Sequence, residues 1–472
     1  MSFVDRVTDL LSPVRVALAR LANAVRPYRR RLISNLVVGL AIALLLQVFD
    51  ASNAGDRLRG TELDATMRLF AGTETPEIQA TNGKSYGVTL LDIDEETLAK
   101  WDEPLFIPRD RLLSLLDYAV QGGAALIVVD VVLNHAGFNQ AGSTTDAKKL
   151  ASYIGSYSRR CADRRGRPGP SVILERGFVP TSRGSQFTML RSYIDPDVIE
   201  GTCVFWASPL FDASDSDGVV RRWRQWESYQ STSGESSGFL LKVPSTQLAV
   251  ATILGNDPKA AFADLRASLT RSASEALPGQ DAAAQRIDGL VQDSSAGGIG
   301  ARVFYTIPWR GAAFPGSISA FRVAGPRERG DDSPLSDEAV RGRLVLIGST
   351  AQNSDLHATP IGMMPGSLII LNAVKSLEMH GVIKPLPIVG ILFVEAALIV
   401  VMSVAFLVFR SFWGMFVSSS LIVAAIPWVT FHLLRSGVFI DFMIPLIAVQ
   451  LHALARRFED ASEHAAPAEE AG

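Results

Sequence analysis

Four long apolar runs constrain this chain more than any other feature. The first, LISNLVVGLAIALLLQVF at residues 32–49, contains no charged residue and is close to the ~20 residues that a membrane-spanning helix needs. Three more runs lie near the C-terminus, at about 386–409, 412–434 and 438–455. The sequence therefore predicts four transmembrane helices, one over residues 32–51 and three within 386–455.

The basic residues beside these runs predict the orientation of the chain. Arginines are frequent in residues 1–31 and cluster at 26–31, and Lys and Arg near a helix end favour the cytoplasmic side. The first helix then exports residues 52–385, and the last three return the chain to a cytoplasmic tail at 456–472. The leader before the first run is long, which favours an uncleaved anchor over a signal peptide.

The overall composition narrows the functional class. The chain has 472 residues, enough for more than one domain. Its formal net charge is −3, so the chain as a whole has no general attraction for nucleic acid. The positive charge is local to residues 1–31, where Leu10, Val14, Leu18 and Leu21 form an apolar stripe. This segment either lies on the membrane surface or is a solvated leader.

The exported segment has the pattern of an α/β domain. YGVTLLDI (86–93) and AALIVVDVVL (124–133) are short apolar runs typical of buried strands, and helical signals lie between them. Strand, helix and strand at this spacing predict a βαβ unit with parallel strands. Further strands are predicted at 171–177, 201–207, 219–229, 302–309 and 343–349, and further helices at 245–255, 258–276, 317–324 and 368–380. The fold expected is an extracytoplasmic α/β domain with a mainly parallel sheet, plus four transmembrane helices. The strand at 219–229 is charged and aromatic, which favours an exposed or edge position.

The chain has two cysteines, Cys161 and Cys203, and both fall in the exported segment. In an oxidising compartment two such thiols suggest one disulfide. Spacing alone also allows two unpaired cysteines.

Acidic residues follow several of the predicted strands. Asp94 comes after the first, Asp130 lies within the second, and Asp355 follows LVLIGST. Ligands of open parallel sheets bind outside the carboxyl ends of the strands, so these acids are candidates for one cleft. Asp94 is equally suited to cap the helix that follows it. The candidate ligand-binding residues are Asp94, Arg109, Asp130, Asp217, Arg221 and Asp355. For Asp217 and Arg221 the alternative is a turn with its own local salt bridge.

One alternative is a hydrolase. LLDIDEETL resembles the DxDx(T/V) motif of haloacid-dehalogenase-type hydrolases, in which the first Asp is the nucleophile and the second the acid/base, with Mg²⁺ balancing the charge. That assigns these roles to Asp92 and Asp94. Glu96 stands where the motif has Thr or Val, and no convincing later Lys precedes an acid pair, which weakens this alternative.

A second resemblance covers most of residues 57–455. LDATMRLF, LLDIDEETLAKW, PRDRLLSLLDYAVQGGAALIVVDVVL, DSDGVVRRW and GRLVLIGSTAQNSDLHATPIGMMPG occur in that order, with one apolar run before them and three after. This arrangement resembles the CHASE2 family of bacterial extracytoplasmic sensory domains. The resemblance implies a multi-pass protein of the bacterial inner membrane, with both termini cytoplasmic and a periplasmic sensory domain. It implies no enzyme activity, no cofactor and no metal.

Such domains usually precede a cytoplasmic cyclase or kinase. Here RRFEDASEHAAPAEEAG (456–472) is too short to be an output domain. The expected function is therefore a sensor subunit that binds an unknown small molecule or protein outside and acts through a signalling partner on another chain, with homo-oligomers possible. The remaining alternative is a scaffold without a ligand. Glu395 and Gln450 lie in the predicted helices and are functional candidates because polar groups in a bilayer are expensive.

Overall fold

The computed structural model describes most of the predicted exported domain and a little of the rest. The described residues are 37, 53–73, 77–80, 83–104, 106–134, 143–180, 187–213, 217–230, 240–270, 287, 290, 302–309, 314–325, 337–351, 355–385, 387, 389–390, 393, 396–397 and 428–439. The chain forms two compact units. One comprises Met67–Lys384 with Arg435–Gly437, and the other comprises Met1–Thr66, Pro385–Leu434 and Val438–Gly472.

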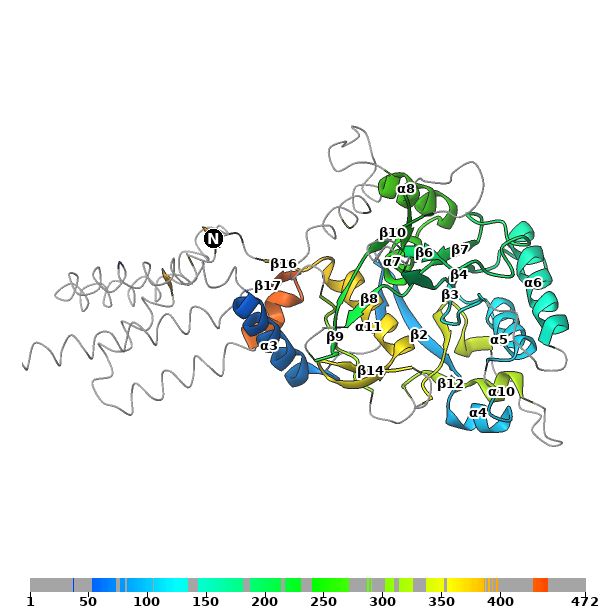
Figure 1. Ribbon diagram of the computed structural model, residues 1–472, viewed down its shortest axis with the longest axis horizontal. Helices are drawn as coiled ribbons and strands as arrows, with labels where there is room; N and C mark the ends of the chain where they lie inside the picture. Colours follow the sequence, from blue (N-terminus) through cyan, green and yellow to red (C-terminus); the bar gives the residue numbers. More distant parts are fainter. Residues whose placement is uncertain are drawn as a thin grey trace, which may run out of the picture. The chain divides into compact units, whose positions relative to one another are not determined.

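A mainly parallel sheet forms the centre of the larger unit (Figure 1). Within the described residues it has seven strands, in the order β1-β2-β13-β3-β4-β7, with β12 also paired to β2. Their bounds are β1 Glu77–Gln79, β2 Ser85–Asp92, β3 Leu126–Val129, β4 Ser171–Glu175, β7 Val204–Ala207, β12 Ser317–Ser319 and β13 Leu344–Gly348. Only β1 pairs antiparallel. The prediction of an α/β domain with a mainly parallel sheet is confirmed.

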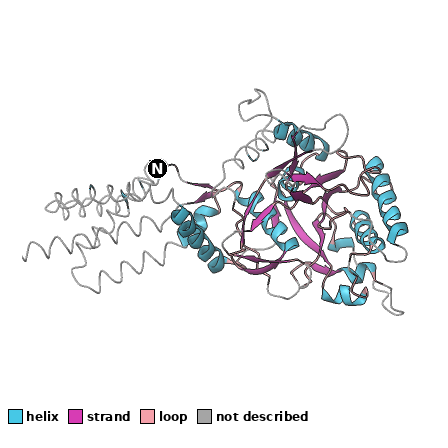
Figure 2. Ribbon diagram, in the orientation of Figure 1, coloured by secondary structure: helices cyan, strands magenta, loops and turns pink. Residues whose placement is uncertain are grey.

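Helices cover both faces of this sheet, as Figure 2 shows. The helices of the larger unit are α4 Glu95–Lys100, α5 Arg109–Gln121, α6 Ser143–Arg160, α7 Thr246–Ile253, α8 Pro258–Thr270, α10 Ala320–Ala324 and α11 Gly366–His380, with a 3₁₀ turn η5 at Asp337–Ala339. α3 Asn53–Phe70 begins in the smaller unit and ends in the larger one. On one face α5 and α6 bury Ile127, Val129 and Val345 of the sheet. On the other, Phe205 packs against Phe262 of α8 at 4.5 Å between ring centroids. The strands are apolar on both faces because both are covered.

The strand order differs from a simple βαβ unit. β2 and β3 are parallel as predicted, but β13 lies between them and pairs with both. The centre of the sheet is therefore completed by a strand from the far end of the domain. The next crossover, from β3 through α6 to β4, does join neighbouring strands.

A smaller four-stranded sheet and two hairpins complete the described larger unit. The sheet has the order β11-β10-β6-β5, with bounds β5 Phe178–Pro180, β6 Phe187–Met189, β10 Trp226–Gln230 and β11 Leu240–Pro244. The hairpins are β8 Phe211–Ala213 with β9 Val220–Trp223, and β14 Leu356–Thr359 with β15 Gly362–Pro365. The short strands β16 Lys384–Pro385 and β17 Val438–Phe439 are also assigned.

The segment predicted as one exposed or edge strand at 219–229 is divided into β9 and β10. That prediction was wrong in its placement. Trp223 is only 1% exposed, and β10 lies inside its sheet. The charged residues of this segment suggested exposure to solvent. In the structure such side chains form local ion pairs, for example Arg224 with Asp212.

The strand predicted at 302–309 is also wrong. Apart from one isolated bridge at Arg302, the segment is extended but forms no ladder with another described strand. Its backbone binds side chains of α11 instead. Asn372 accepts hydrogen bonds from the N–H groups of Thr306 and Ile307 and donates to the Ile307 carbonyl, while Ser376 accepts from the Phe304 N–H.

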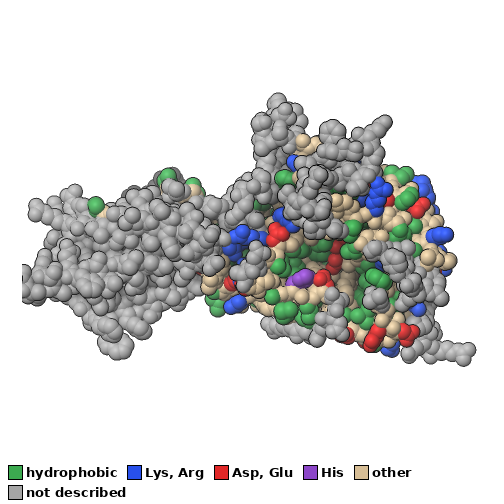
Figure 3. All heavy atoms as spheres, viewed as in Figure 1, with side chains coloured by type: hydrophobic (Ala, Val, Ile, Leu, Met, Phe, Trp, Pro, Cys, Tyr) green, Lys and Arg blue, Asp and Glu red, His purple; other side chains and the backbone are tan. Residues whose placement is uncertain are grey.

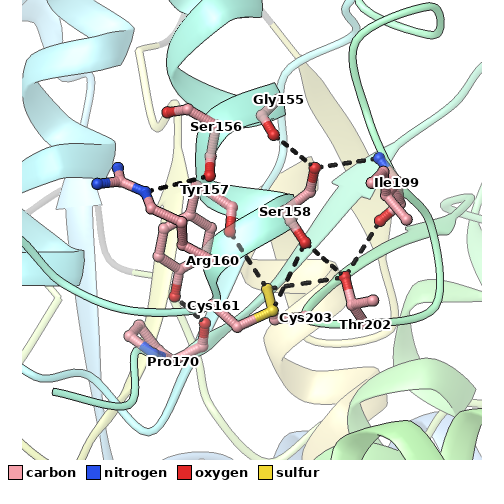
Figure 4. The surroundings of a disulfide bond; sticks show 10 residues. All are labelled: Gly155, Ser156, Tyr157, Ser158, Arg160, Cys161, Pro170, Ile199, Thr202 and Cys203. Atoms are coloured by element: carbon pink, nitrogen blue, oxygen red, sulfur yellow. Dashed lines mark hydrogen bonds between the residues drawn. A yellow bond between two sulfur atoms is a disulfide. The ribbon is translucent and has the colours of Figure 1, made fainter. Parts of the chain in front are cut away.

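The disulfide joins the end of α6 to the start of β7 (Figure 4). Cys161 and Cys203 have their Cα atoms 5.7 Å apart, within the range that a disulfide requires. Ser158, one turn earlier in α6, binds the same loop through Ile199 N–H and Thr202 Oγ1. The cross-link therefore fixes α6 to the sheet at the end opposite to its first turn.

The predicted transmembrane helices cannot be compared with the structure. Residues 32–51 apart from residue 37, and most of 386–455, lie outside the described residues, as do Glu395, Gln450, the N-terminal segment 1–31 and the tail 456–472. In the portion of the chain that is described, no helix combines the length and apolar character needed to cross a bilayer.

Candidate functional site at the carboxyl edge of the sheet

A pair of hydrogen-bonded carboxyl groups lies at the carboxyl ends of β3 and β4. Glu175 is the last residue of β4 and is 1% exposed, and Asp130 follows β3 directly and is half-buried. The two side chains hydrogen-bond each other. Two carboxyl groups in such contact must share a proton.

Two helices supply hydroxyl donors to this pair. Thr246, the first residue of α7, donates to Glu175 Oε1 at 2.9 Å, and Ser367, near the start of α11, donates to Asp130 Oδ2. Burial is the largest cause that raises the pKa of each carboxyl group, and Asp130 raises the pKa of Glu175 further. We assign the shared proton to Glu175, because it is the more deeply buried partner and its pKa lies well above its usual range.

Glycine makes the close approach of these elements possible. A Cβ at Gly348, the last residue of β13, would collide with Ser367 Oγ and lie 3.0 Å from Asp130 Oδ2. A Cβ at Gly366 would collide with the carboxylate of Asp355. Any other residue at either position would force the start of α11 away from the strand ends.

Asp355 is a solvent-exposed acid near the Asp130–Glu175 pair, and its charge raises the pKa of both carboxyl groups. Its Oδ1 is 2.6 Å from His357 Nε2, and its backbone carbonyl accepts from the Gly366 N–H. Both side chains are well exposed. The hydrogen bond that the His357 ring donates to Asp355 raises the pKa of His357. The exposed face in Figure 3 shows acidic, histidine and hydrophobic side chains near one another.

Asp92 is buried at the end of β2 and is only 4% exposed. Thr350 donates its hydroxyl to both Asp92 oxygens at 2.8 Å and its backbone N–H to Oδ1 at 3.1 Å. Burial raises the pKa of Asp92 to about 6, with a smaller contribution from Asp94. The carboxylate is therefore bound to the loop after β13.

Asp94 is the N-cap of α4, as one of the two sequence interpretations predicted. Its Oδ1 accepts from the Thr97 N–H at 2.8 Å and from Ser319 Oγ at 3.1 Å. Thr97 in turn accepts from the Phe321 N–H. Asp94 thus connects α4 to the segment containing β12 and α10.

Arg109 begins α5 and is 5% exposed. Its guanidinium lies over the ring of Tyr193, 5.9 Å from the ring centroid. Burial lowers the pKa of this arginine, which nevertheless remains charged. Arg109 is therefore a buried residue that packs against Tyr193.

Asp217 and Arg221 form the local salt bridge that was the alternative to a ligand role. Arg221 Nη2 lies 2.8 Å from Asp217 Oδ2, and the Val219 N–H donates to Asp217 Oδ1. The structure places this pair at the start of β9.

Among its described residues, the carboxyl edge does not have the ligands of a metal site. In the part of the chain that the structure describes, no three His, Cys, Asp or Glu side chains converge as a metal would require. The oxygens of Asp92 are occupied by Thr350. The Mg²⁺ of the hydrolase alternative therefore does not fit these residues.

Sequence reasoning missed the partners of the predicted acids. Glu175, Ser367 and Thr246 were not candidates, although each is fully or partly buried against a carboxyl group. One signal was present for Glu175, which ends the buried apolar run SVILE. A charged residue in such a run requires a partner.

Comparison with known protein families identifies the family of the chain. The model of the CHASE2 domain matches residues 37–408. The chain belongs to the CHASE2 domain family. CHASE2 domains are extracytoplasmic sensory domains, as the resemblance in the sequence implied. No curated protein and no solved structure matches the chain significantly.

Proposed function

We propose that this CHASE2 protein is a membrane receptor subunit that binds its ligand at the carboxyl edge of the sheet and signals through a partner chain. The observation that supports this most is the direct connection of α11 to that edge. Ser367 binds Asp130, so a ligand that changes the hydrogen bonding of Asp130 acts on the start of α11.

The same helix continues the connection inside the larger unit. Asn372 of α11 holds the backbone of Thr306 and Ile307. This segment in turn binds the residues that enter the domain, because the Tyr305 N–H donates to Met67 Sδ and the Gly72 N–H donates to the Thr306 carbonyl. We infer that the end of α3 responds to movements of α11 through these bonds.

The hydrolase alternative requires an accessible nucleophile. Asp92 is 4% exposed and both its oxygens accept hydrogen bonds from Thr350, so a phosphoester cannot approach it without a rearrangement of that loop. The scaffold alternative requires a partner but no ligand response.

One experiment separates the three functions. The full chain is purified from its native membrane with its bound partners, as the parent and as Ser367→Ala. Kinase or cyclase activity that copurifies and changes in Ser367→Ala supports the receptor. Copurified activity that does not respond indicates a scaffold, and Mg²⁺-dependent phosphoester hydrolysis that is lost in Asp92→Asn indicates the hydrolase. Absence of any copurified output activity refutes signalling through a partner chain.

A further inference from the structure

A surface pocket of about 420 Å³ lies beside the first half of α6. Its volume falls in the range of roughly 300–1,000 Å³ that is typical of small-molecule sites. α6 follows β3 in the chain, and Ser192 Oγ, next to the pocket residue Tyr193, donates to the Leu133 carbonyl just beyond β3. The pocket is therefore at the carboxyl side of the sheet, where ligands of parallel sheets bind.

Small side chains on one face of α6 form the floor of the pocket. Ala147 and Ala151 are one turn apart and are 2% and 5% exposed. On the same face, Gly155 lies against the backbone carbonyl of Asp197 at a distance that leaves no room for a Cβ. The groove is thus closed at Gly155, and the two alanines line its floor.

The walls of the pocket have opposite charges. Lys148 extends from α6, and Asp197 lies on the facing turn. In the described part of the chain neither side chain forms a salt bridge, either with the other or with a third residue, whereas the adjacent Lys149 pairs with Asp146 at 2.9 Å. One cationic and one anionic group are therefore available to the same ligand.

Tyr193 adds a buried hydroxyl group. Its oxygen is inaccessible to solvent and has no hydrogen-bond partner among the described residues, which is uncommon for a buried polar atom. The Arg109 guanidinium lies over its ring. Burial raises the pKa of Tyr193, so its hydroxyl remains a donor. A small movement of this side chain toward a bound acceptor would satisfy it.

We propose that this pocket binds a free amino acid, with the ligand carboxylate at Lys148 and Tyr193 and the ligand ammonium at Asp197. A ligand with one charge satisfies only one wall, whereas a small zwitterion satisfies both. The alanine floor accommodates the ligand side chain. This inference gives a ligand class to the proposed receptor and depends on that function only for its biological meaning.

Binding is measured by calorimetry on the full chain in lipid nanodiscs, with the standard L-amino acids as probes. At least one is expected to bind, and its N-acetyl and amide derivatives, which each lack one charge, are expected to bind at least about tenfold more weakly. Lys148→Met and Asp197→Asn are expected to weaken binding about 10- to 100-fold, because each removes a charge-assisted contact. Ala151→Leu is expected to abolish binding by filling the floor.

Lys149→Met is the matched control, since it removes the neighbouring lysine that already has a partner. The proposal is overturned if no amino acid binds, if the singly charged derivatives bind as tightly, or if Lys149→Met weakens binding as much as Lys148→Met. Lys148 and Asp197 are exposed, so their variants test the pocket even if Ala151→Leu does not fold. If an amino acid binds but no copurified output activity responds to it, the proposed pocket is supported and the proposed receptor function is refuted.

Discussion

Replacement of Asp92 by Asn is expected to stabilise this domain at alkaline pH. The carboxyl group is buried, and its pKa in the folded chain is about 6 against an ordinary value of 3.8. Because the folded pKa is the higher one, the folded state binds the proton more tightly than the unfolded state does. The group therefore contributes stability below about pH 4, and this contribution is lost as the pH rises through about 6.

The size of the effect follows from the shift. A rise of the pKa from 3.8 to about 6 corresponds to about 3 kcal/mol. Asn has the shape of the protonated acid. Its amide oxygen can accept from the Thr350 N–H, and its amide nitrogen can donate to Thr350 Oγ1, which replaces the bonds of the parent. We expect Asp92→Asn to unfold with about 2–3 kcal/mol more free energy than the parent near pH 8, and with almost no difference near pH 4.

The measurement is urea unfolding of the full chain in detergent, followed by tryptophan fluorescence at several pH values. Asp337→Asn is the control, because Asp337 is exposed and its replacement removes a carboxylate from the surface and not from the interior. A difference between Asp92→Asn and the parent that is the same at acid and alkaline pH would refute the reasoning, since it would mean that folding does not raise the pKa of the buried carboxyl group.

Three further predictions use the same unfolding assay. Replacing both Cys161 and Cys203 by Ser should lower the free energy of unfolding by about 4 kcal/mol, because the disulfide closes a loop of about 42 residues and restricts the unfolded chain. Reductant should lower the stability of the parent by the same amount. An unchanged urea midpoint of the parent in reductant would contradict a formed disulfide. Asn372→Leu should lower the free energy of unfolding by about 3–5 kcal/mol, because two N–H groups and one carbonyl lose their partner. The control Asn256→Ala removes one partly buried hydrogen bond and should cost about 1 kcal/mol. Equal losses in the two variants would argue against the role of Asn372. Burial raises the pKa of Glu175, so the stabilising contribution of its protonated form is lost as the pH rises through the pKa that Glu175 has in the folded chain. Glu175→Gln should therefore make the free energy of unfolding less sensitive to alkaline pH. An unchanged pH profile would exclude the shared proton.

The sequence predicts the central sheet well because its strands are buried on both faces. Continuous apolar runs such as SYGVTLLD in β2 and LVLIG in β13 need no knowledge of their neighbours to be identified. The cap of α4 is equally local, since Asp94 and the Thr97 N–H are three residues apart. These features depend on short stretches of chain, and the structure has them where the pattern placed them.

The features that the sequence did not predict depend on distant contacts. The extended segment 302–309 resembles a strand in composition, but its N–H groups bind Asn372 and Ser376 of α11, more than sixty residues away. The proton shared with Glu175 likewise depends on Asp130, which comes from another strand. Whether a buried acid caps a helix, pairs with a second acid or meets a ligand is decided by neighbours that the local pattern does not contain.

The position of β13 has a consequence for how the domain is made. β2 and β3 are not neighbours and meet only through β13, whose residues 344–348 are synthesised after nearly the whole domain. Until then each of these strands has an unpaired edge, and such edges are prone to wrong pairing. The domain therefore cannot fold progressively from its N-terminus. Assembly of its central sheet waits for β13, which comes from the far end of the domain.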